Sequence, residues 1–178
     1  MPVAKFRYTS NMKKLYIMCG VAFSGKSTLA KEISKEKEAV LVSQDHFWFE
    51  KKQEMNLDLD NDEDWERILK LSRAEVRRVL MDGHSVVYDD ISLKYSDREL
   101  LRNLAEECKA RPILVYLDTP REIQQERQRK NLQTMERHDV PDNIVEWGLG
   151  QLEIPQRTEE PFMYTPNTNL RIWLNSLP

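Results

Sequence analysis

The chain has 178 residues, of which 40% are hydrophobic and 32% are charged, and its formal net charge at pH 7 is -3. This composition is typical of a globular protein and excludes a membrane-embedded one, because no run approaches the ~20 apolar residues needed to span a bilayer. The negative net charge disfavours a long nucleic acid as partner, since nucleic-acid binding usually requires a basic face.

The cysteines and the N-terminal residues bear on the cellular compartment. Only Cys19 and Cys108 occur, so the chain has neither a disulfide framework nor the paired cysteines of a zinc site. The first 14 residues contain no apolar run of the length of a signal peptide. We therefore expect a cytoplasmic protein that makes no membrane contact, with one domain over residues 1–178 and a monomeric or homodimeric state.

A phosphate-binding motif follows the first predicted strand, which is the apolar run at residues 15–19. The motif G-x-x-x-x-G-K-S occupies residues 20–27, and an amphipathic helix follows it to about residue 37. Its glycines allow successive backbone N–H groups to face phosphate oxygens, and the helix N-terminus adds partial positive charge. The motif predicts a bound nucleoside triphosphate, with Lys26 at its β- and γ-phosphates and the Ser27 hydroxyl on Mg²⁺. The other motif residues expected at the nucleotide are Gly20, Ala22, Phe23, Ser24 and Gly25.

Carboxylates follow the next two predicted strands. Asp45 comes just after the apolar run at residues 39–43, and Asp89 and Asp90 end the run at residues 85–90. Because ligands of parallel sheets bind at the carboxyl ends of the strands, these side chains should lie beside the phosphate-binding motif. Asp45 is a candidate for the base that accepts a hydroxyl proton, or for holding a metal-bound water. Asp89 and Asp90 are both candidates for orienting the metal.

The segment from residue 47 to 82 differs in character from the strands around it. Its aromatic triplet at residues 47–49 is expected in an exposed loop, residues 54–66 are strongly acidic, and the apolar spacing predicts a long amphipathic helix over residues 63–82. An acidic, aromatic-lined pocket would suit a cationic or sugar-like hydroxylated molecule, such as an aminoglycoside-like compound. An acidic run is also typical of a solvated face.

The second half of the chain continues the alternation of helices and strands. A capping box opens a helix at residue 96, and residues 112–118 form an apolar strand. A short helix over residues 141–152 and a loop punctuated by prolines follow. The apolar alternation at residues 170–174 predicts the final strand. This order of elements requires an α/β fold, in which right-handed crossovers place helices on both faces of a parallel sheet.

The helix that Thr119 and Pro120 are predicted to open is almost entirely polar. It is either a solvated helix or a mobile lid near residues 120–140 that brings Arg127 and Arg129, with the neighbouring lysine, to the transferring phosphate. His138 follows in the same stretch and is a candidate for a position near the substrate, as His46 is for a position beside Asp45.

Five of these elements together resemble the P-loop kinases that include polynucleotide 5′-kinases, zeta toxins and small antibiotic phosphotransferases, the AAA_33-type group. The resemblance extends from about residue 14 to residue 155. The elements that carry it are the phosphate-binding loop at 20–28, residues 43–45, residues 86–93, residues 115–120 and the arginine-rich stretch at 126–130.

This resemblance implies a three-layer P-loop kinase fold, with a parallel five-stranded sheet in the order 2-3-1-4-5. It implies ATP and Mg²⁺ as cofactors, an acceptor-side segment near residues 47–82, and Asp45 as the base for the acceptor hydroxyl. Asp89 or Asp90 would lie near the metal and the acceptor. The residues implied at ATP and Mg²⁺ or in the lid are Lys26, Ser27, Thr28, Arg127 and Arg129.

We therefore expect an ATP-dependent kinase whose acceptor is a hydroxyl group of an antibiotic- or sugar-like small molecule. Two alternatives stay open, a polynucleotide or nucleoside 5′-hydroxyl kinase and a nucleotide-binding module or slow NTPase without an acceptor. Polynucleotide 5′-kinases carry an arginine three residues after the aspartate, where this chain has Trp48. Their lid arginines are four residues apart, whereas Arg127 and Arg129 are two apart. Both departures weigh against a polynucleotide acceptor.

Overall fold

Five strands form one parallel sheet in the computed structural model, which describes residues 12–58, 61–134 and 140–178. The strand order is β2-β3-β1-β4-β5, and the neighbouring strands all pair in parallel. The strands are β1 Lys14–Cys19, β2 Val40–Ser43, β3 Val86–Asp89, β4 Arg111–Leu117 and β5 Phe162–Tyr164. The predicted α/β fold and its strand order are confirmed.

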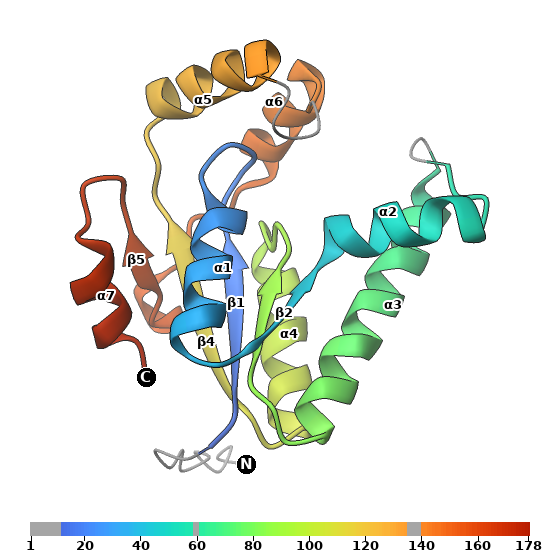
Figure 1. The fold of residues 1–178 in the computed structure, drawn as a ribbon, viewed down its shortest axis with the longest axis vertical. Coiled ribbons are helices and arrows are strands. Elements are labelled where there is room, and N and C mark those ends of the chain that lie inside the picture. Colours follow the sequence, from blue (N-terminus) through green and yellow to red (C-terminus); the bar gives the residue numbers. More distant parts are fainter. Residues whose placement is uncertain (1–11, 59–60, 135–139) are drawn as a thin grey trace.

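Helices cover both faces of this sheet (Figure 1). They are α1 Lys26–Glu36, α2 Gln44–Glu54, α3 Asp62–Met81, α4 Tyr95–Glu107, α5 Arg121–Thr134, α6 Asp142–Gln151 and α7 Leu170–Ser176, with a short 3₁₀ turn, η1, at Arg157–Glu159. None of the helices in the described ranges is long and apolar enough to cross a membrane.

The side chains of β1 explain why the fold has three layers. Leu15 and Ile17 share one core with residues of α3 and α4. Tyr16 and Met18, which point to the opposite face, share a second core with residues of α1 and α7. A central strand that is buried on both faces must be apolar at every position, so its sequence is a continuous apolar run rather than an alternating one.

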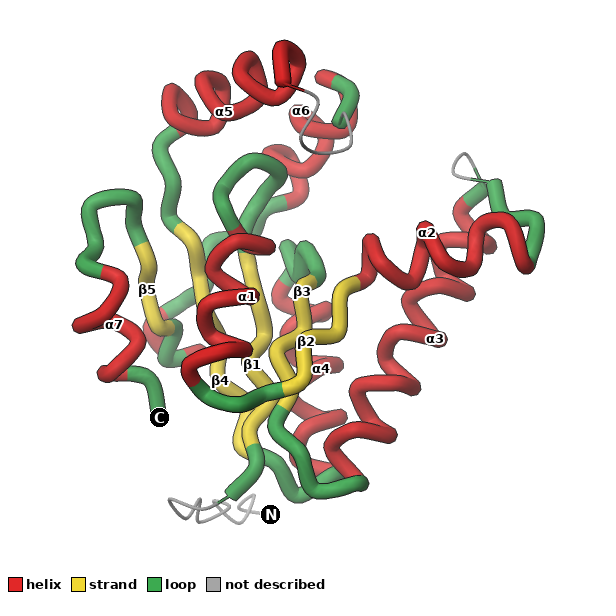
Figure 2. The backbone as a smooth tube through the Cα atoms, in the orientation of Figure 1, coloured by secondary structure: helices red, strands yellow, loops and turns green. Residues whose placement is uncertain are grey.

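The C-terminal edge of the sheet lies between two groups of helices (Figure 2). α5 and α6 lie beyond the ends of β1 and β4, near the loop that joins β1 to α1. α2 and the N-terminal part of α3 extend outward on the side of β2, and the two helices pack on each other. Ligands of parallel sheets bind at this edge, and here helices from both sides reach toward it.

A buried ion pair joins the chain that follows α6 to the centre of the fold. The side chains of Arg98 and Glu159 are 1% and 2% exposed, and 2.7 Å separate Arg98 Nε from Glu159 Oε2. Arg98 also donates hydrogen bonds to the main-chain oxygens of Ser92 and Leu93, in the loop after β3. Burial acts to raise the pKa of Glu159, but the hydrogen bonds from Arg98 and Arg102 outweigh it and bring that pKa down to about 2.

The aromatic triplet after β2 is not an exposed loop, so that prediction is wrong. Residues 47–49 lie within α2. Trp48 is only 3% exposed because it stacks on Trp65 of α3, with the two ring centroids 4.9 Å apart. Together with Leu57 and Ile68 these rings form a small core that holds α2 against α3. Phe47 also packs against this core, whereas Phe49 is 45% exposed, so two of the three aromatic side chains serve to pack the helices together.

The prediction of a final strand at residues 170–174 is also wrong, because these residues belong to α7. The side chain of Asn169 caps this helix by accepting a hydrogen bond from the Ile172 backbone N–H over 3.1 Å. Trp173 and Leu174 are buried and Ile172 is 70% exposed, which is a helical pattern and not an alternating one. The fifth strand lies earlier, at Phe162–Tyr164, where its three residues are too few to show a period.

The helical assignment of α7 can be tested by two alanine substitutions at adjacent positions. Trp173→Ala removes a ring that packs in the α1 core and donates a 2.7 Å hydrogen bond from Nε1 to the Met163 carbonyl oxygen. It should lower the free energy of unfolding by about 3–5 kcal/mol. Ile172→Ala, the control, should change it by no more than about 0.5 kcal/mol because that side chain is exposed. Urea denaturation measures both, and equal losses would contradict the assignment.

Candidate active site

The phosphate-binding motif forms the loop between β1 and α1, at the C-terminal edge of the sheet (Figure 1). Gly25 ends the loop with a φ of 102°, a conformation that side chains other than glycine rarely adopt. A Cβ atom on Gly25 would lie 3.1 Å from a guanidinium nitrogen of Arg127, so the end of that side chain would have to shift with another residue there. α1 begins at Lys26, which places the positive end of the helix dipole at the loop.

Lys26 lies between this loop and the predicted carboxylates. Its Nζ donates a hydrogen bond across the loop to the Val21 carbonyl oxygen, over 3.3 Å. Burial lowers the pKa of Lys26, and the negative charges of Asp89, Asp45 and Asp90 act to raise it. The fold thus brings the three carboxylates that were predicted from three separate stretches of sequence into the electrostatic environment of one lysine.

The register of β2 against β3 explains how these carboxylates meet. Ser43, the last residue of β2, pairs with Asp89, the last residue of β3. Asp45 in the first turn of α2 and Asp90 after β3 therefore leave neighbouring strands at the same level. Asp89 and Asp90 are buried, whereas Asp45 is exposed. Burial raises the pKa of Asp90 to about 6, although its Oδ1 accepts a 2.6 Å hydrogen bond from the Ile91 N–H.

The loop offers surroundings that fit a nucleotide with Mg²⁺. Within the described ranges, no three His, Cys, Asp or Glu side chains converge into a preformed metal site. Mg²⁺ suits such surroundings because it keeps several waters and is held by substrate phosphates and one or two protein oxygens. Ser24 Oγ is buried and has no hydrogen-bond partner among the described residues, and a phosphate oxygen would satisfy it. The candidate metal-binding oxygens are those of Ser27, Asp45, Asp89 and Asp90.

The two predicted lid arginines occupy different positions on α5. Nη1 of Arg127 donates hydrogen bonds to the main-chain oxygens of Ser24 and Phe23, over 2.6 and 3.1 Å. Arg129 is exposed and donates from Nε to the Gln125 carbonyl oxygen of its own helix, over 3.4 Å. Arg127 therefore contacts the phosphate-binding loop directly, and Arg129 does not.

Thr119 contributes to the loop in a way that its sequence context did not predict. Its hydroxyl donates a 2.9 Å hydrogen bond to the Ser24 carbonyl oxygen, instead of capping α5. Gln124 Nε2 in turn donates to the Thr119 carbonyl oxygen over 2.6 Å. The Ser24 carbonyl thus accepts from both Thr119 and Arg127, which fixes the loop to the end of β4 and to α5. The sequence signal for this role is the position of Thr119 just past a buried strand at the functional edge.

A cavity of about 300 Å³ lies beside the loop, on the side of α1, α5 and α7. Apolar and polar side chains from these helices and from the ends of β4 and β5 line it, among them Thr28, Leu117, Arg127, Asn131, Tyr164 and Leu170. Such a mixed lining suits the base and sugar of a nucleotide whose phosphates rest on the loop. Asp45, Asp89 and Asp90 do not line this cavity. The loop therefore has a cavity on one side and carboxylates on the other.

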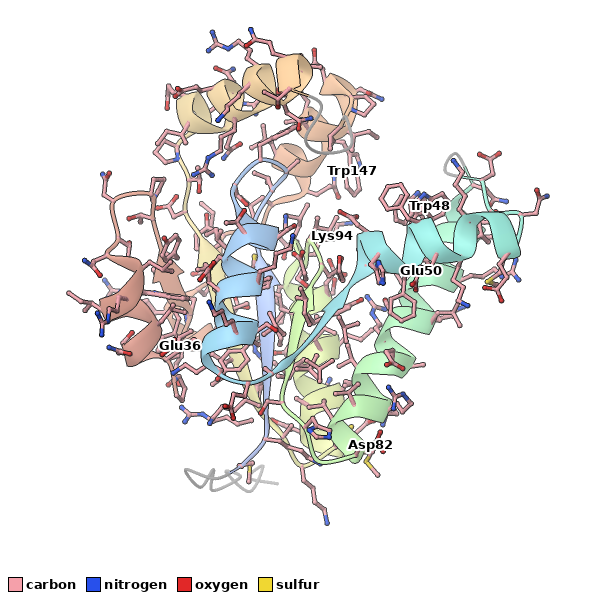
Figure 3. All side chains as sticks on the ribbon, viewed as in Figure 1. Glu36, Trp48, Glu50, Asp82, Lys94 and Trp147 are labelled. Carbon is pink, nitrogen blue, oxygen red and sulfur yellow. The ribbon has the colours of Figure 1, made fainter. Side chains whose placement is uncertain are left out.

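The histidines and the acidic segment do not converge on the loop. His46 is exposed and its Nε2 lies 3.1 Å from Oε1 of Glu50, one turn further along α2, where Figure 3 shows Glu50. His138 lies outside the described residues. Nearer the edge, Figure 3 shows Lys94 of the loop after β3, and Trp147 of α6, which is 52% exposed.

Comparisons with known proteins agree with this fold. The model of the AAA_33 family, described as an AAA domain, matches residues 15–155. A search of curated proteins finds no match.

Solved structures similar to the chain over most of its length include three kinases. A sugar kinase from Janibacter sp. HTCC2649 is 21% identical with a TM-score of 0.65, and the match covers 92% of this chain and 91% of that one. A gluconokinase from Sinorhizobium meliloti 1021 is 21% identical with a TM-score of 0.64, covering 92% and 89%. The APS kinase of Mycobacterium tuberculosis, in complex with AMPPNP and APS, is 20% identical with a TM-score of 0.64, covering 92% and 94%. This likeness establishes the P-loop kinase fold.

The buried carboxyl of Asp90 makes stability depend on pH, and Asp90→Asn should remove that dependence. Its pKa of about 6 in the folded chain is above the ordinary value of 3.8. The folded chain therefore holds this proton more tightly than the unfolded chain. This tighter proton binding stabilises the folded chain fully below about pH 4, and the stabilisation is lost as the pH rises through about 6. A neutral amide avoids the loss, so the substitution should raise the free energy of unfolding at pH 7.5 by about 1–3 kcal/mol.

Urea denaturation in the presence of EDTA, at pH 4 and pH 7.5, measures this difference. At pH 4 the wild type and Asp90→Asn should have closely similar free energies of unfolding. A variant that is no more stable than the wild type at pH 7.5 would contradict a raised pKa for Asp90.

Proposed function

Because the chain belongs to the AAA_33 family of AAA domains, we propose that it is an ATP-dependent kinase that transfers the γ-phosphate to a hydroxyl group of a small molecule. The observation that carries this proposal is the convergence of Asp89, Asp45 and Asp90 on Lys26 at the phosphate-binding loop. A loop that only bound a nucleotide would need the lysine, whereas an exposed carboxylate at the same edge provides a base for an acceptor. The similar sugar kinase and gluconokinase support a small hydroxylated acceptor.

The donor nucleotide would occupy the cavity side of the loop. Its base and sugar would lie in the 300 Å³ cavity, its phosphates on the loop N–H groups and Ser24 Oγ, and its γ-phosphate at Lys26. Mg²⁺, bound by Ser27, Asp89 or Asp90 and the phosphates, would neutralise part of the charge of the phosphates.

The acceptor would approach from the carboxylate side. Asp45 would take the proton of the acceptor hydroxyl, and the acceptor oxygen would form its bond to the γ-phosphorus as the bond to the β–γ bridging oxygen breaks, which releases ADP. Asp45 suits this role because it is exposed, and so accessible to an acceptor, in the first turn of α2. Lys26 and Arg127 would stabilise the charge that spreads over the transferring phosphoryl oxygens.

The test of this function is ATP consumption in the presence and absence of acceptors. The panel contains sugars, sugar acids, sugar phosphates, nucleosides, an aminoglycoside and a 5′-hydroxyl oligonucleotide. At least one small hydroxylated compound should stimulate ADP release, and Asp45→Asn should lower kcat for that compound by ~10²–10⁴-fold while ATP still binds. Lys26→Ala should abolish transfer with the fold intact, as circular dichroism would show.

Three outcomes would contradict parts of this proposal. Turnover that no member of the panel stimulates would favour a nucleotide-binding module or slow NTPase. Stimulation by the oligonucleotide alone would favour a polynucleotide kinase. An unchanged kcat in Asp45→Asn would leave the kinase activity in place and assign Asp45 a structural role.

The contacts on α5 predict that its two arginines contribute unequally. Arg127→Met should lower kcat by ~10²-fold or more, because it removes a cation already at the loop and leaves the Phe23 and Ser24 carbonyl oxygens without a donor from α5. Arg129→Met removes the same charge from the same helix but no contact to the loop, so its loss of kcat should be at least ~10-fold smaller. Steady-state kinetics with saturating ATP measure both variants. Equal losses would indicate that α5 rotates on binding and that Arg129 also reaches the phosphates.

A further inference from the structure

Arg73 of α3 is a cation at the carboxylate side of the site that forms no ion pair with a described carboxylate. Its Nε is buried and has no hydrogen-bond partner in the described part of the chain. The preceding residue, Ser72, forms a buried 2.8 Å hydrogen bond with the Tyr88 hydroxyl. Tyr88 is followed directly by Asp89 and Asp90, so this bond fixes the turn of α3 that carries Arg73 against the C-terminal end of β3.

The charge of Arg73 acts on the same carboxyl as Lys26. Burial raises the pKa of Asp90, and the positive charges of Arg73 and Lys26 act to lower it. Arg73 also acts to lower the pKa of Tyr88, both through its charge and through a side-chain hydrogen bond, so the Tyr88 hydroxyl is its neutral partner within the chain. Asp90 therefore interacts with two cations, of which one belongs to the phosphate-binding loop and the other to α3. Neither Asp90 nor any other described carboxylate forms a direct ion pair with Arg73.

The other arginines of α3 have partners at the surface. Arg67 pairs with Asp64, Arg77 with Glu107, and Arg78 with Glu75 and Asp82, at N···O distances of 2.6–3.4 Å. Those partners are exposed or lie one helical turn away, so they serve the helix surface. Arg73 differs from them in both position and pairing. A guanidinium that is partly withdrawn from water and lacks a carboxylate partner is unfavourable unless something else binds it.

We propose that Arg73 binds an oxyanion of the phosphate acceptor, a carboxylate, phosphate or sulfate group, so that the acceptor is a hydroxylated anion. This inference rests on the proposed function and specifies its substrate class. The planar guanidinium fork matches the geometry of such groups and can donate two parallel hydrogen bonds to one of them. Held there, the acceptor would lie on the α3 side of Asp90, across from Lys26, with its hydroxyl directed toward Asp45 and the transferring phosphate.

The acidic residues that first suggested a cationic acceptor are engaged elsewhere. Glu54 lies 2.6 Å from Lys51 and Glu66 lies 3.5 Å from Lys70, in exposed ion pairs on the surfaces of α2 and α3. No described contact brings these two side chains to the phosphate-binding loop. Among the arginines of α3, Arg73 is the one that faces the acceptor side without a described carboxylate as its ion-pair partner.

The experiment compares matched acceptors that differ in one anionic group. The pairs are glucose with gluconate and with glucose 6-phosphate, ribose with ribose 5-phosphate, and adenosine with adenosine 3′-monophosphate. Acceptor-dependent ADP release is measured for the wild type, Arg73→Met, Arg73→Lys and the control Arg77→Met, which removes an equal charge from the exposed face of α3. Thermal denaturation of each variant establishes that it is folded.

For at least one pair, we expect the anionic member to have a kcat/KM at least ~30-fold above its neutral partner in the wild type and in Arg77→Met. Arg73→Met should lower kcat/KM for the anionic member by ~10²-fold, mainly through KM, and leave the neutral member within ~3-fold. Arg73→Lys should recover part of the loss because it restores the charge but not the fork. The preferred member shows whether the group is a carboxylate or a phosphate. Equal effects of Arg73→Met and Arg77→Met would overturn the inference. Preference for the neutral members or for an aminoglycoside would overturn it too. In each case the observed ATP-dependent transfer would still support the kinase function.

If no acceptor is turned over, a second measurement tests whether Arg73 binds an oxyanion. The protein is saturated with ADP and Mg²⁺, so that the phosphate-binding loop is filled, and sodium sulfate is titrated against sodium chloride at equal ionic strength while Tm is followed. A saturable rise in Tm that is present in the wild type and Arg77→Met and absent in Arg73→Met would support an oxyanion site at Arg73. Equal rises in all three proteins would reflect the general stabilising effect of sulfate and would overturn the inference.

Discussion

The need of Lys26 for negative charge organises the C-terminal edge of the sheet. A buried ammonium group is unfavourable unless opposite charges compensate it, and here Asp89, Asp45 and Asp90 do so from two neighbouring strands. Burial raises the pKa of Asp90 to about 6, although the Ile91 N–H and the charges of Arg73 and Lys26 act to lower it. The edge therefore holds an ammonium group and carboxylates whose burial, taken alone, destabilises the folded chain. Polar groups that are held together at some expense in stability are characteristic of sites that bind something.

Two sets of contacts keep this edge in place, and they differ in strength. The buried pair of Arg98 and Glu159 is bidentate, with further hydrogen bonds from Arg98 to the loop after β3, so it fixes that loop and the carboxylates that precede it. α5, in contrast, is held at the loop mainly by hydrogen bonds from Thr119 and Arg127, and it buries polar rather than apolar side chains. Few buried apolar contacts characterise elements that open at low free-energy cost. The carboxylate side is thus the more firmly held part of the site, and α5 is the less firmly held part.

The sequence predicted those features that depend on local pattern. The glycine spacing, the apolar run of β1 and the carboxylates after β2 and β3 are each local, and parallel-sheet topology alone places them together. Prediction from the sequence failed where the same residues were compatible with two different structures. The triplet at residues 47–49 was equally compatible with an exposed loop and with the packing of α2 on α3, and only the distant Trp65 decides between them. Residues 170–174 alternate as a strand would, but Asn169 caps them as a helix and Trp173 finds its core on α1.

Arg73 could not be identified from sequence, because it is one of four arginines on a long charged helix. The comparison with Arg98 shows what the structure adds. Both arginines are withdrawn from water near the loop after β3, but the Nε of Arg98 donates to Glu159 over 2.7 Å, whereas the Nε of Arg73 has no partner among the described residues. The same fold therefore pairs the guanidinium of Arg98 with a carboxylate, and leaves that of Arg73, on the carboxylate side of Lys26, with one unsatisfied nitrogen and no carboxylate. A structural arginine needs its partner within the chain, so an incomplete one beside a phosphate-binding loop indicates that the partner is a ligand.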